Sequence, residues 1–597
     1  MSDTLAGMAT VASVIVVLAA AYIPLGDYLA RVFTSDKDLA VERFCYRAVG
    51  VNPRRSQTWI GYAVSVLAFS VVSVLVLYVL QRIQGHLPWS DGKPGLPPAM
   101  AFNTAISFVS NTNWQSYSPE AVMSNLTQMI GLAVQNFVSA AVGIAVAVAV
   151  VRALANRRGD GQIGNFWVDL VRSCLRVLLP LSFIVAIVLI SQGAIQSWHT
   201  GFDHTAVDGR AMSSAVGPFA SQEAIKELGT NGGGTYLANS AHPFSNPTPL
   251  SNVVEIIALL LIPVCLTRTY GRLVGDHRQG LTLVGVMAVI WGAMLTLVWA
   301  FEVRGDGVAA HAAGALMEGK EVRIGIPGSA LFAVSTTGTS TGAVNSAHDS
   351  FSAGGGGAVL WNMLLGEVAP GGVGSGLYGI LIMAVVTVFV GGLLVGRTPE
   401  ILGKKIGQRE ITMAALYVLV MPALVLVGTG ISVALGSTTD YQGNSGDPGT
   451  AGSIHGFSEV LYAYASAANN NGSAFGGLTV TSDWFQTSLG FAMLLGRFLP
   501  IVFVLALAGL LARQRAREPG VARGGGVTPG DTSGSAGAGG TAGGVATKIA
   551  ADELTETSTL PTHGLLFGAL LTGVILLVAG LTFFPAMALG PIAEALI

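Results

Sequence analysis

Charged residues are scarce in this sequence. Asp, Glu, Lys and Arg together make up 11% of its 597 residues, whereas hydrophobic residues make up 51%. Soluble globular domains carry about 25% charged residues, so the composition excludes a large soluble protein. The net charge of −2 argues against nucleic acid as a partner.

Cysteine is also rare, and clustered metal ligands are missing. The three cysteines, Cys45, Cys174 and Cys265, lie far apart without a CxxC pair, which indicates neither a disulfide framework nor a zinc site. The nine histidines form no HExxH motif and are expected to be scattered structural or loop residues. No Gly-Lys pair is followed by Ser or Thr, and no DKTGT motif is present, so we expect no ATP hydrolysis by this chain alone and no organic cofactor.

Long apolar runs are abundant. Runs of roughly 20 apolar residues can cross a bilayer as helices, and ten such segments are found, at 8–32, 57–80, 122–151, 168–190, 252–266, 281–301, 359–394, 411–435, 488–511 and 565–589. The fifth is short and could begin earlier. We therefore predict an all-α polytopic membrane protein with ten transmembrane helices in the lipid bilayer.

The basic residues predict the orientation. No basic residue precedes the first span, and the first one, Arg31, lies at its far end. With the N-terminus outside, the cytoplasmic loops hold 21 of the 31 Lys and Arg residues and the exterior segments hold seven. This asymmetry agrees with the positive-inside rule. A Gly-, Ala-, Thr- and Ser-rich stretch at 513–560 is predicted to be a flexible cytoplasmic loop.

A short polar loop appears four times between apolar segments, each time after a short helix and on the predicted exterior. The copies contain SNTNWQ (110–115), GTNGGG (229–234), TSTGA (339–343) and NNNGS (469–473). If Gln115, Gly232, Gly342 and Gly472 are equivalent, the spacings are 117, 110 and 130 residues. This recurrence predicts four repeats of helix, re-entrant pore loop and helix.

The four loops are predicted to surround a shared axis in pseudo-fourfold symmetry. Irregular backbone at membrane depth is tolerated where it is buried in protein or lines a water-filled cavity, and loop oxygens can replace the hydration shell of a monovalent cation. The alternative is that these are ordinary exterior Gly/Asn turns. The predicted K⁺ filter residues are Asn111, Thr112, Asn113, Gln115, Thr230, Asn231, Gly232, Ser340, Thr341, Gly342, Asn470, Asn471 and Gly472.

The seventh span is interrupted at 367–376, which contains Glu367, a proline and several glycines. Such residues destabilise a helix by about 1–3 kcal/mol each. We predict an intramembrane loop below the filter that restricts flow, although close helix packing by small residues is an alternative. Arg497 lies in the ninth span, and Glu367 is its candidate counter-charge, with either a gating or a purely structural role. The predicted gate and ion-path residues are Glu367, Gly371, Gly372, Gly374 and Arg497.

Several stretches resemble the KdpA family, the potassium-binding, channel-like subunits of bacterial potassium-transporting P-type ATPases in the superfamily of K⁺ transporters. The most specific is LGEVAPGGVGSGLYG (365–379), accompanied by SNTNWQ, GTNGGG, GRTPEILGKKI (396–406), NNNGSAF (469–475) and LPTHG (560–564). The resemblance runs from the first span to the C-terminus. The chain departs from it in the length of the low-complexity loop.

The resemblance implies a multi-pass protein of the bacterial inner membrane that binds K⁺ in the filter and passes it sideways to a partner. The implied partners are a KdpB-like catalytic subunit, which uses the ATP, and KdpC-like and small KdpF-like subunits. The corresponding division is an N-terminal helix and loop (1–56), pore repeats (57–160, 161–275, 276–410 and 411–512), the flexible loop (513–560) and a C-terminal helix (561–597).

Two other functions are open to the sequence. A stand-alone Trk/Ktr-type K⁺ transporter would share the repeat and the filter, but the 365–379 match and the two extra spans favour the pump subunit. A membrane-embedded enzyme would need catalytic groups that converge in the bilayer. Glu367 and Arg497 are too few for this, and no nucleophile–base pair is visible.

Overall fold

The computed structural model describes residues 3–304, 317–435, 451–515 and 560–596. Ten helical segments in this part of the chain are long and apolar enough to cross a membrane, which confirms the prediction of ten spans. They are α1 (Asp3–Thr34), α3 (Trp59–Ile83), the π-helical η2 with α6 (Thr127–Ala133, Val134–Ala155), α7 with the π-helical η3 and α8 (Phe166–Arg172, Ser173–Leu178, Leu179–Ser191), α10 (Pro249–Val274), α11 (His277–Arg304), α15 (Ser375–Leu394), α16 (Gln408–Ala434), α19 (Asp483–Ala512) and α21 (Leu565–Leu589).

The fifth span is longer than its apolar run. Helix α10 begins at Pro249, three residues before the predicted start, because the side chain of Thr248 accepts a hydrogen bond from the backbone of Ser251 and caps the helix. It then continues past Leu266 through a polar segment to Val274, and Gly275 ends it in a left-handed conformation. Caps, rather than apolarity, therefore determine both ends.

Four shorter helices precede the four polar loops. They are α4 (Pro98–Val109), α9 (Phe219–Leu228), α13 (Gly325–Gly338) and α18 (Ala451–Asn469). We call them the pore helices. Each lies in the chain between two of the spans, so the order of span, pore helix, loop and span recurs four times among the described residues.

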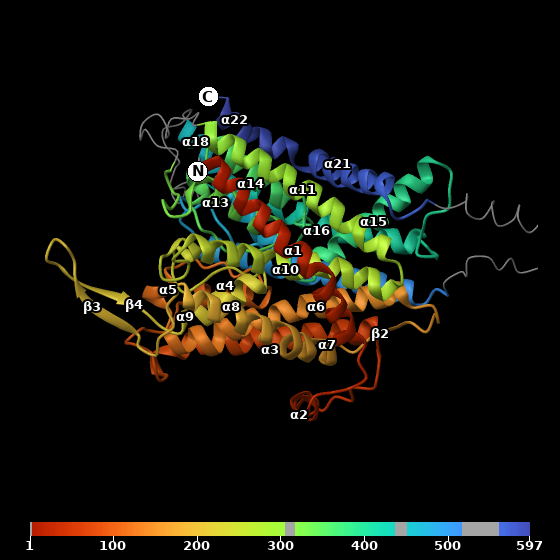
Figure 1. The fold of residues 1–597 in the computed structure, drawn as a ribbon, viewed down its shortest axis with the longest axis horizontal. Coiled ribbons are helices and arrows are strands. Elements are labelled where there is room, and N and C mark those ends of the chain that lie inside the picture. Colours follow the sequence, from red (N-terminus) through yellow and green to blue (C-terminus); the bar gives the residue numbers. More distant parts are fainter. Residues whose placement is uncertain (1–2, 305–316, 436–450, 516–559, 597) are drawn as a thin grey trace, which may run out of the picture.

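Both chain ends lie on the same side of the molecule, at the left of Figure 1, where the hairpin of β3 (Gly201–Thr205) and β4 (Ala211–Ala215) also projects. We call this side the terminal face. The opposite side, at the right of Figure 1, carries β2 (Gln162–Gly164), and α2 (Ala40–Val49) projects below the helices. The described part of the chain crosses between the two faces ten times, so it returns to the side on which it began.

The remaining elements are short. Strand β1 (Gln57–Thr58) pairs with β2, and β5 (Glu400–Ile401) pairs with β6 (Lys404–Lys405), all antiparallel. The short helices are α5 (Pro119–Val122), α14 (Ala353–Leu364), α22 (Pro591–Ala595) and the 3₁₀ turns η1 (Gln84–His86), η4 (Asn239–Ala241) and η5 (His348–Ser350).

The seventh span is interrupted, as predicted. The predicted segment 359–394 falls on two helices, α14 and the membrane-spanning α15, and residues 365–374 between them are not helical. Gly366, Gly371 and Gly374 all have positive φ in this segment, with values of 85°, 79° and 86°. Such angles are costly for residues with a Cβ atom, so the glycines permit the break. We call residues 365–374 the intramembrane loop.

The spans differ in how deeply they are buried. In the most apolar window of the third span, which includes α6, 83% of the residues are buried inside the protein, whereas in α1 only 6% are. Helix α6 therefore lies at the centre, and α1 presents apolar side chains at the surface, as expected for a helix that faces lipid. The predicted flexible loop at 513–560 falls outside the described residues except at its two ends.

Candidate functional site: four converging pore loops

All four pore helices end in the same backbone arrangement. In each, the carbonyl of a residue in the last turn accepts a hydrogen bond from the N–H of the residue five positions later, in the loop. The four bonds are Thr112 to Ser107 (2.9 Å), Asn231 to Lys226 (2.8 Å), Thr341 to Thr336 (3.0 Å) and Asn471 to Ser466 (2.8 Å). This shared hydrogen bond identifies the equivalent residues of the four loops, although their sequences have diverged.

One residue in each loop has a left-handed backbone. Asn111, Thr230, Ser340 and Asn470 have φ values of 68°, 48°, 55° and 58°. Residues other than glycine rarely adopt such angles, and where they do the surrounding structure must hold them there. Four such residues at matching positions turn the chain sharply after each pore helix.

The four loops contact one another in a closed ring. At least one hydrogen bond joins each neighbouring pair: Asn111 Nδ2 to the Thr230 carbonyl (2.9 Å), Gly342 N to the Asn231 carbonyl (3.4 Å), Ser340 Oγ to the Asn470 carbonyl (3.1 Å) and Asn470 Nδ2 to Thr112 Oγ1 (3.0 Å). Segments up to 358 residues apart in the chain therefore meet around one centre.

Glycine is required where the loops touch. A Cβ atom on Gly232 would lie 2.4 Å from Gly342 Cα, and one on Gly472 would lie 2.0 Å from the Thr112 carbonyl oxygen. A Cβ on Gly342 would lie 2.7 Å from the carbonyl carbon of Gly472. Any side chain at these positions would push the loops apart.

The matching geometry corrects the alignment of the first loop. Counting from the left-handed residues, the equivalent of Gly232, Gly342 and Gly472 is Asn113 and not Gln115. Asn113 also has a positive φ, of 59°, which is why an asparagine can replace the glycine there. Gln115 instead bridges two loops, because its Oε1 accepts a hydrogen bond from Gly234 N at 2.9 Å.

The intramembrane loop packs directly against the ring. Val373 N donates to Thr230 Oγ1 at 2.9 Å, and Gly371 N donates to the carbonyl of Gly338, at the end of pore helix α13, at 2.7 Å. On its other side, a Cβ on Gly374 would lie 2.0 Å from the carbonyl oxygen of Gly143 in α6. The loop is held between the filter candidates and the central helix. A Cβ on Gly372, the remaining predicted gate glycine, would lie 2.4 Å from Ser375 Oγ.

Glu367 and Arg497 are both buried but are not ion-paired to each other, so the predicted counter-charge is wrong. Glu367 Oε1 accepts a hydrogen bond from Asn471 Nδ2 at 2.8 Å, whereas Arg497 Nη2 donates to the Ser139 carbonyl at 3.4 Å. Among the described residues, no ion pair joins the two groups. The carboxylate is directed to the fourth loop and the guanidinium to α6.

The two charged groups line the same cavity, of about 120 Å³. Its inner wall consists of the third and fourth loops and the intramembrane loop, including Ser340, Asn470 and Glu367. Its outer wall consists of α16 and α21, with Tyr417 and Phe583 among the lining residues. The cavity therefore lies between the third and fourth loops on one side and α16 and α21 on the other.

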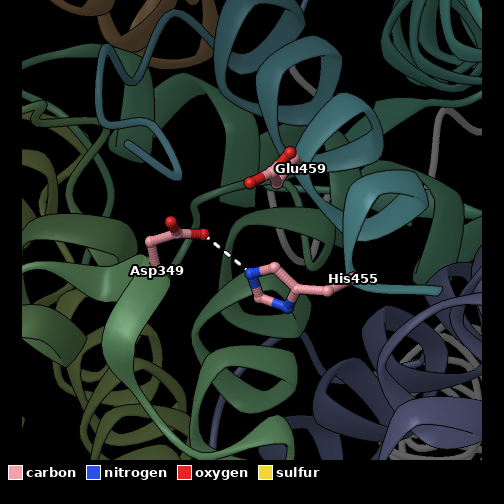
Figure 2. A group of neighbouring side chains, drawn as sticks. All are labelled: Asp349, His455 and Glu459. Carbon is pink, nitrogen blue, oxygen red and sulfur yellow. Dashed lines mark hydrogen bonds and ion pairs between the residues drawn. The ribbon is translucent and has the colours of Figure 1, made fainter. Parts of the chain in front are cut away.

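A second charged cluster, the rim cluster, lies at the start of the fourth pore helix, at the terminal face. His455 forms two hydrogen bonds of 2.8 Å with carboxylate oxygens. Asp349 Oδ1 accepts from Nε2, and Glu594 Oε1 accepts from Nδ1. Figure 2 shows the contact between His455 and Asp349, with Glu459 one turn further along α18. Burial lowers the pKa of His455, but the hydrogen bonds to the two carboxylates outweigh this effect and raise its pKa to about 10. A protonated imidazole therefore joins α18 to the C-terminal helix α22.

This rim cluster connects to the fourth loop. The His455 ring stacks on Phe475, which stacks on Tyr462 with ring centroids 4.2 Å apart. The Tyr462 hydroxyl shares a hydrogen bond with Ser473 Oγ at 2.8 Å, and Ser473 Oγ donates to Asn471 Oδ1 at 2.6 Å. These residues all lie within 455–475, but the ring stacking and the hydroxyl contacts that join them depend on how the loop folds back on α18, which residue spacing does not predict.

Sequence reasoning also missed the side chains that support the loops from behind. Ser107 Oγ donates to the Trp114 carbonyl (2.9 Å), Thr336 Oγ1 donates to the Ala343 carbonyl (2.6 Å), and Ser466 Oγ accepts from Gly472 N (2.9 Å). These hydroxyls lie five residues before the third residue of each loop, so a search at that fixed offset would have found them.

The comparisons with known proteins agree with this architecture. The family model described as KdpA, potassium-transporting ATPase A subunit, matches residues 12–522 and 541–596. A protein of Rhodococcus erythropolis named potassium-transporting ATPase potassium-binding subunit is 66% identical over 596 residues, covering 100% of both chains. A protein of the same name from Mycobacteroides abscessus is 65% identical over 608 residues, again covering 100% of both.

Among solved structures, the potassium transporter TrkH from Vibrio parahaemolyticus is 13% identical with a TM-score of 0.49, covering 83% of this chain and 96% of that one. The family assignment rests on the sequence matches, which span both chains from end to end. With a family model that covers nearly the whole chain and relatives at two-thirds identity, this protein belongs to the KdpA family of potassium-transporting ATPase A subunits.

Proposed function

We propose that this chain is the potassium-binding subunit of an ATP-driven K⁺ uptake complex, and that the ring of four loops is its K⁺ filter. The curated relatives carry the name of a potassium-binding subunit over their full length, which favours this role over a stand-alone Trk/Ktr-type transporter. The observation that carries the filter assignment is the closed ring of contacts, since it brings residues of all four loops together around one centre.

The chemistry of the ring suits a monovalent cation. Its predicted members present carbonyl, hydroxyl and amide oxygens and include no carboxylate, and carbonyl rings of this kind replace the hydration shell of K⁺. The four pore helices end at the loops, so the negative ends of their dipoles favour a cation there. In the described part of the chain, the buried side chain of Asn113 has no hydrogen-bond partner, so its amide oxygen is available to an ion.

The route below the filter is proposed to run sideways. The intramembrane loop lies under the ring and restricts direct passage, and the cavity beside it extends to α16 and α21. Glu367, with one carboxylate oxygen lacking a hydrogen-bond partner among the described residues, offers an oxygen ligand along this route. A KdpB-like catalytic subunit beside these helices would receive the ion and hydrolyse the ATP, and KdpC-like and KdpF-like subunits would complete the complex.

The orientation follows from the basic residues. We place the terminal face, with the N-terminus, outside a bacterial inner membrane, because the connections on the opposite face carry most of the Lys and Arg residues. The repeats at 57–160, 161–275, 276–410 and 411–512 would each contribute one loop.

Replacing two ring residues tests the filter. Gly232→Asp would place a carboxylate against Gly342, and Gln115→Arg would remove the acceptor for Gly234 N and add a positive charge. We expect both variants to lose high-affinity K⁺ uptake and K⁺/Na⁺ discrimination. Gly430→Ala is the matched control, because a Cβ atom there has no atom within 4 Å in the described structure. Unchanged K⁺ affinity and discrimination in both variants would refute the filter.

A further inference from the structure

Three buried glutamates meet behind the second loop. Glu223 and Glu227 lie on pore helix α9, and Glu255 lies on α10. Their exposures are 2%, 0% and 0%, and one oxygen from each carboxylate lies within 4.8 Å of the others. We call these residues the glutamate cluster. It is separate from the filter ring and is not part of the cation route proposed above.

One side of the cluster is fully provided with donors. Lys226 Nζ lies 2.9 Å from Glu223 Oε2 and donates to Asn239 Oδ1 at 2.7 Å. Ser240 Oγ donates to Glu223 Oε1 at 2.7 Å and approaches Glu227 Oε1 at 3.0 Å. The turn that contains Asn239 and Ser240 covers the cluster and provides neutral contacts only.

The other side of the cluster has no donors. Among the described residues, Glu227 Oε2 and both oxygens of Glu255 have no hydrogen-bond partner. The three carboxylates and Lys226 sum to a charge of −2 when all are ionised. An uncompensated buried charge costs several kcal/mol, so Glu227 and Glu255 must be neutralised, either by protons or by a cation bound between them.

We propose that the glutamate cluster binds one Ca²⁺ ion from the exterior. A divalent ion brings the charge of the cluster to zero, whereas a monovalent ion leaves −1. Arg323 is engaged elsewhere, with Glu321 and with the carbonyl of Asn246. The cluster contains oxygen ligands alone, which hard cations prefer.

The spacing and burial favour Ca²⁺ over Mg²⁺. Calcium binds oxygens at about 2.3–2.6 Å in flexible geometry, so two ligands on opposite sides of it lie about twice that distance apart, and the 4.8 Å limit on the carboxylate oxygens is compatible with this. Magnesium retains several waters in near-ideal octahedral geometry, which a fully buried site does not favour. Glu255 could bind with both oxygens, and Glu223 and Glu227 with one each.

Such an ion would fasten the second pore helix. At the other three loops, a Ser or Thr hydroxyl at the end of the pore helix bonds to its own loop. At the second loop the equivalent residue is Lys226, whose side chain extends instead to Glu223 and Asn239. The ion would join α9 to α10 and stabilise the helix end from which this loop emerges.

The test measures ion content and thermal stability of the purified full-length protein in detergent at constant K⁺. After EGTA treatment and desalting, CaCl₂ or MgCl₂ is added back, and bound metal is counted by mass spectrometry. We expect one Ca²⁺ per chain and a rise in Tm of at least about 2 °C at saturating Ca²⁺, with a smaller rise for Mg²⁺, because a ligand that binds only the folded state stabilises it.

Variants locate the ion. Glu255→Gln and Glu227→Gln should each reduce bound Ca²⁺ by at least about tenfold and abolish the Tm response, because each removes a charged ligand. Glu321→Gln is the control, since Glu321 is a half-exposed acid that pairs with Arg323 outside the cluster. The wild-type EGTA measurement stands even if a variant does not fold.

Wild-type protein that retains no Ca²⁺ and shows no Tm response to either ion would overturn the proposal and would mean that protons neutralise Glu227 and Glu255. An equal Ca²⁺ response in wild type and in a folded Glu255→Gln variant would also overturn it, by locating the ion elsewhere. Both results are independent of K⁺ uptake, so they leave the filter proposal untouched.

Discussion

The ring of pore loops and the intramembrane loop differ in how often they occur. The loop after a pore helix appears four times with the same backbone turn, at Asn111, Thr230, Ser340 and Asn470. The break in the following span appears once among the described residues, between α14 and α15, whereas the corresponding α6, α10 and α19 continue without interruption across the membrane.

This difference suggests two separate roles, ion binding for the ring and the direction of ion exit for the intramembrane loop. A fourfold ring offers equivalent oxygens from every direction, which suits the binding of a spherical ion. A single interruption cannot be symmetric about that axis, and it places Glu367 and the cavity on one side only. Under the proposed function, ion binding would depend on the repeated element, and the direction of exit would depend on the element that breaks the repeat.

The largest expected effect comes from widening the ring at any one of its glycine contacts. A methyl group on Gly472 would lie 2.0 Å from the Thr112 carbonyl oxygen, and one on Gly342 would lie 2.7 Å from Gly472. We expect Gly472→Ala and Gly342→Ala each to weaken apparent K⁺ affinity by about 100-fold, or about 2.7 kcal/mol. Rubidium uptake at graded K⁺ would measure this. A strong effect in one loop and none in the other would contradict the equivalence of the loops.

A smaller and different effect is expected from the intramembrane loop. Gly374→Ala would place a methyl group 2.0 Å from the Gly143 carbonyl oxygen, and deletion of 371–374 would remove Val373 and with it the hydrogen bond to Thr230 Oγ1. Both should change ATP-driven flux by about tenfold, a barrier change of about 1.4 kcal/mol, while K⁺ affinity stays within about twofold. Unchanged uptake in the deletion variant would remove the gating role.

Glu367→Gln should have a more modest effect. The amide oxygen of glutamine can still accept from Asn471 Nδ2, which is 2.8 Å from Glu367 Oε1, so the fourth loop keeps its position. The ionisable carboxyl group below the ring is lost, and we expect the transport rate to fall severalfold with K⁺ affinity retained. A transport assay at saturating K⁺ measures the rate. A loss of affinity with an unchanged rate would instead place Glu367 within the filter.

The smallest expected effect is on stability at the rim. The pKa of His455 is raised to about 10 in the folded protein, above its ordinary value of about 6.5. Its contacts with Asp349 and Glu594 therefore stabilise the fold fully below about pH 6.5, and this stabilisation is lost as pH rises through about 10. Glu594→Gln should lower Tm by about 1–3 °C at neutral pH, and the gap to wild type should close near pH 10. A gap that stays constant with pH would show that His455 is not charged.

Much of the fold could be predicted because the bilayer requires long apolar helices. Ten runs gave ten spans, and Pro370 with its neighbouring glycines gave the interruption of the seventh. The ends of α10 could not be found in this way, because Thr248 and Gly275 determine them through local hydrogen bonds and backbone angle rather than through hydropathy.

The candidate site could be predicted in outline but not in register. The first loop was aligned two residues late, because Asn113 stands where the other three loops have glycine. The sequence alone does not show that Asn113 has a positive φ. The partners of Glu367 and Arg497 depend on how helices rotate against one another, which hydropathy does not specify. The glutamate cluster escaped notice because Glu223 and Glu227 have the spacing of an exposed helix face, and Glu255 lies in a separate span.

The central claim is that a dehydrated K⁺ ion sits where the four loops meet. The most direct test is a structure of the purified protein with Rb⁺ replacing K⁺, in which the anomalous signal locates the ion. Density on the axis among Asn113, Gly232, Gly342 and Gly472 is the predicted result. Rubidium bound away from these four residues, with the axis empty at saturating Rb⁺, would contradict it.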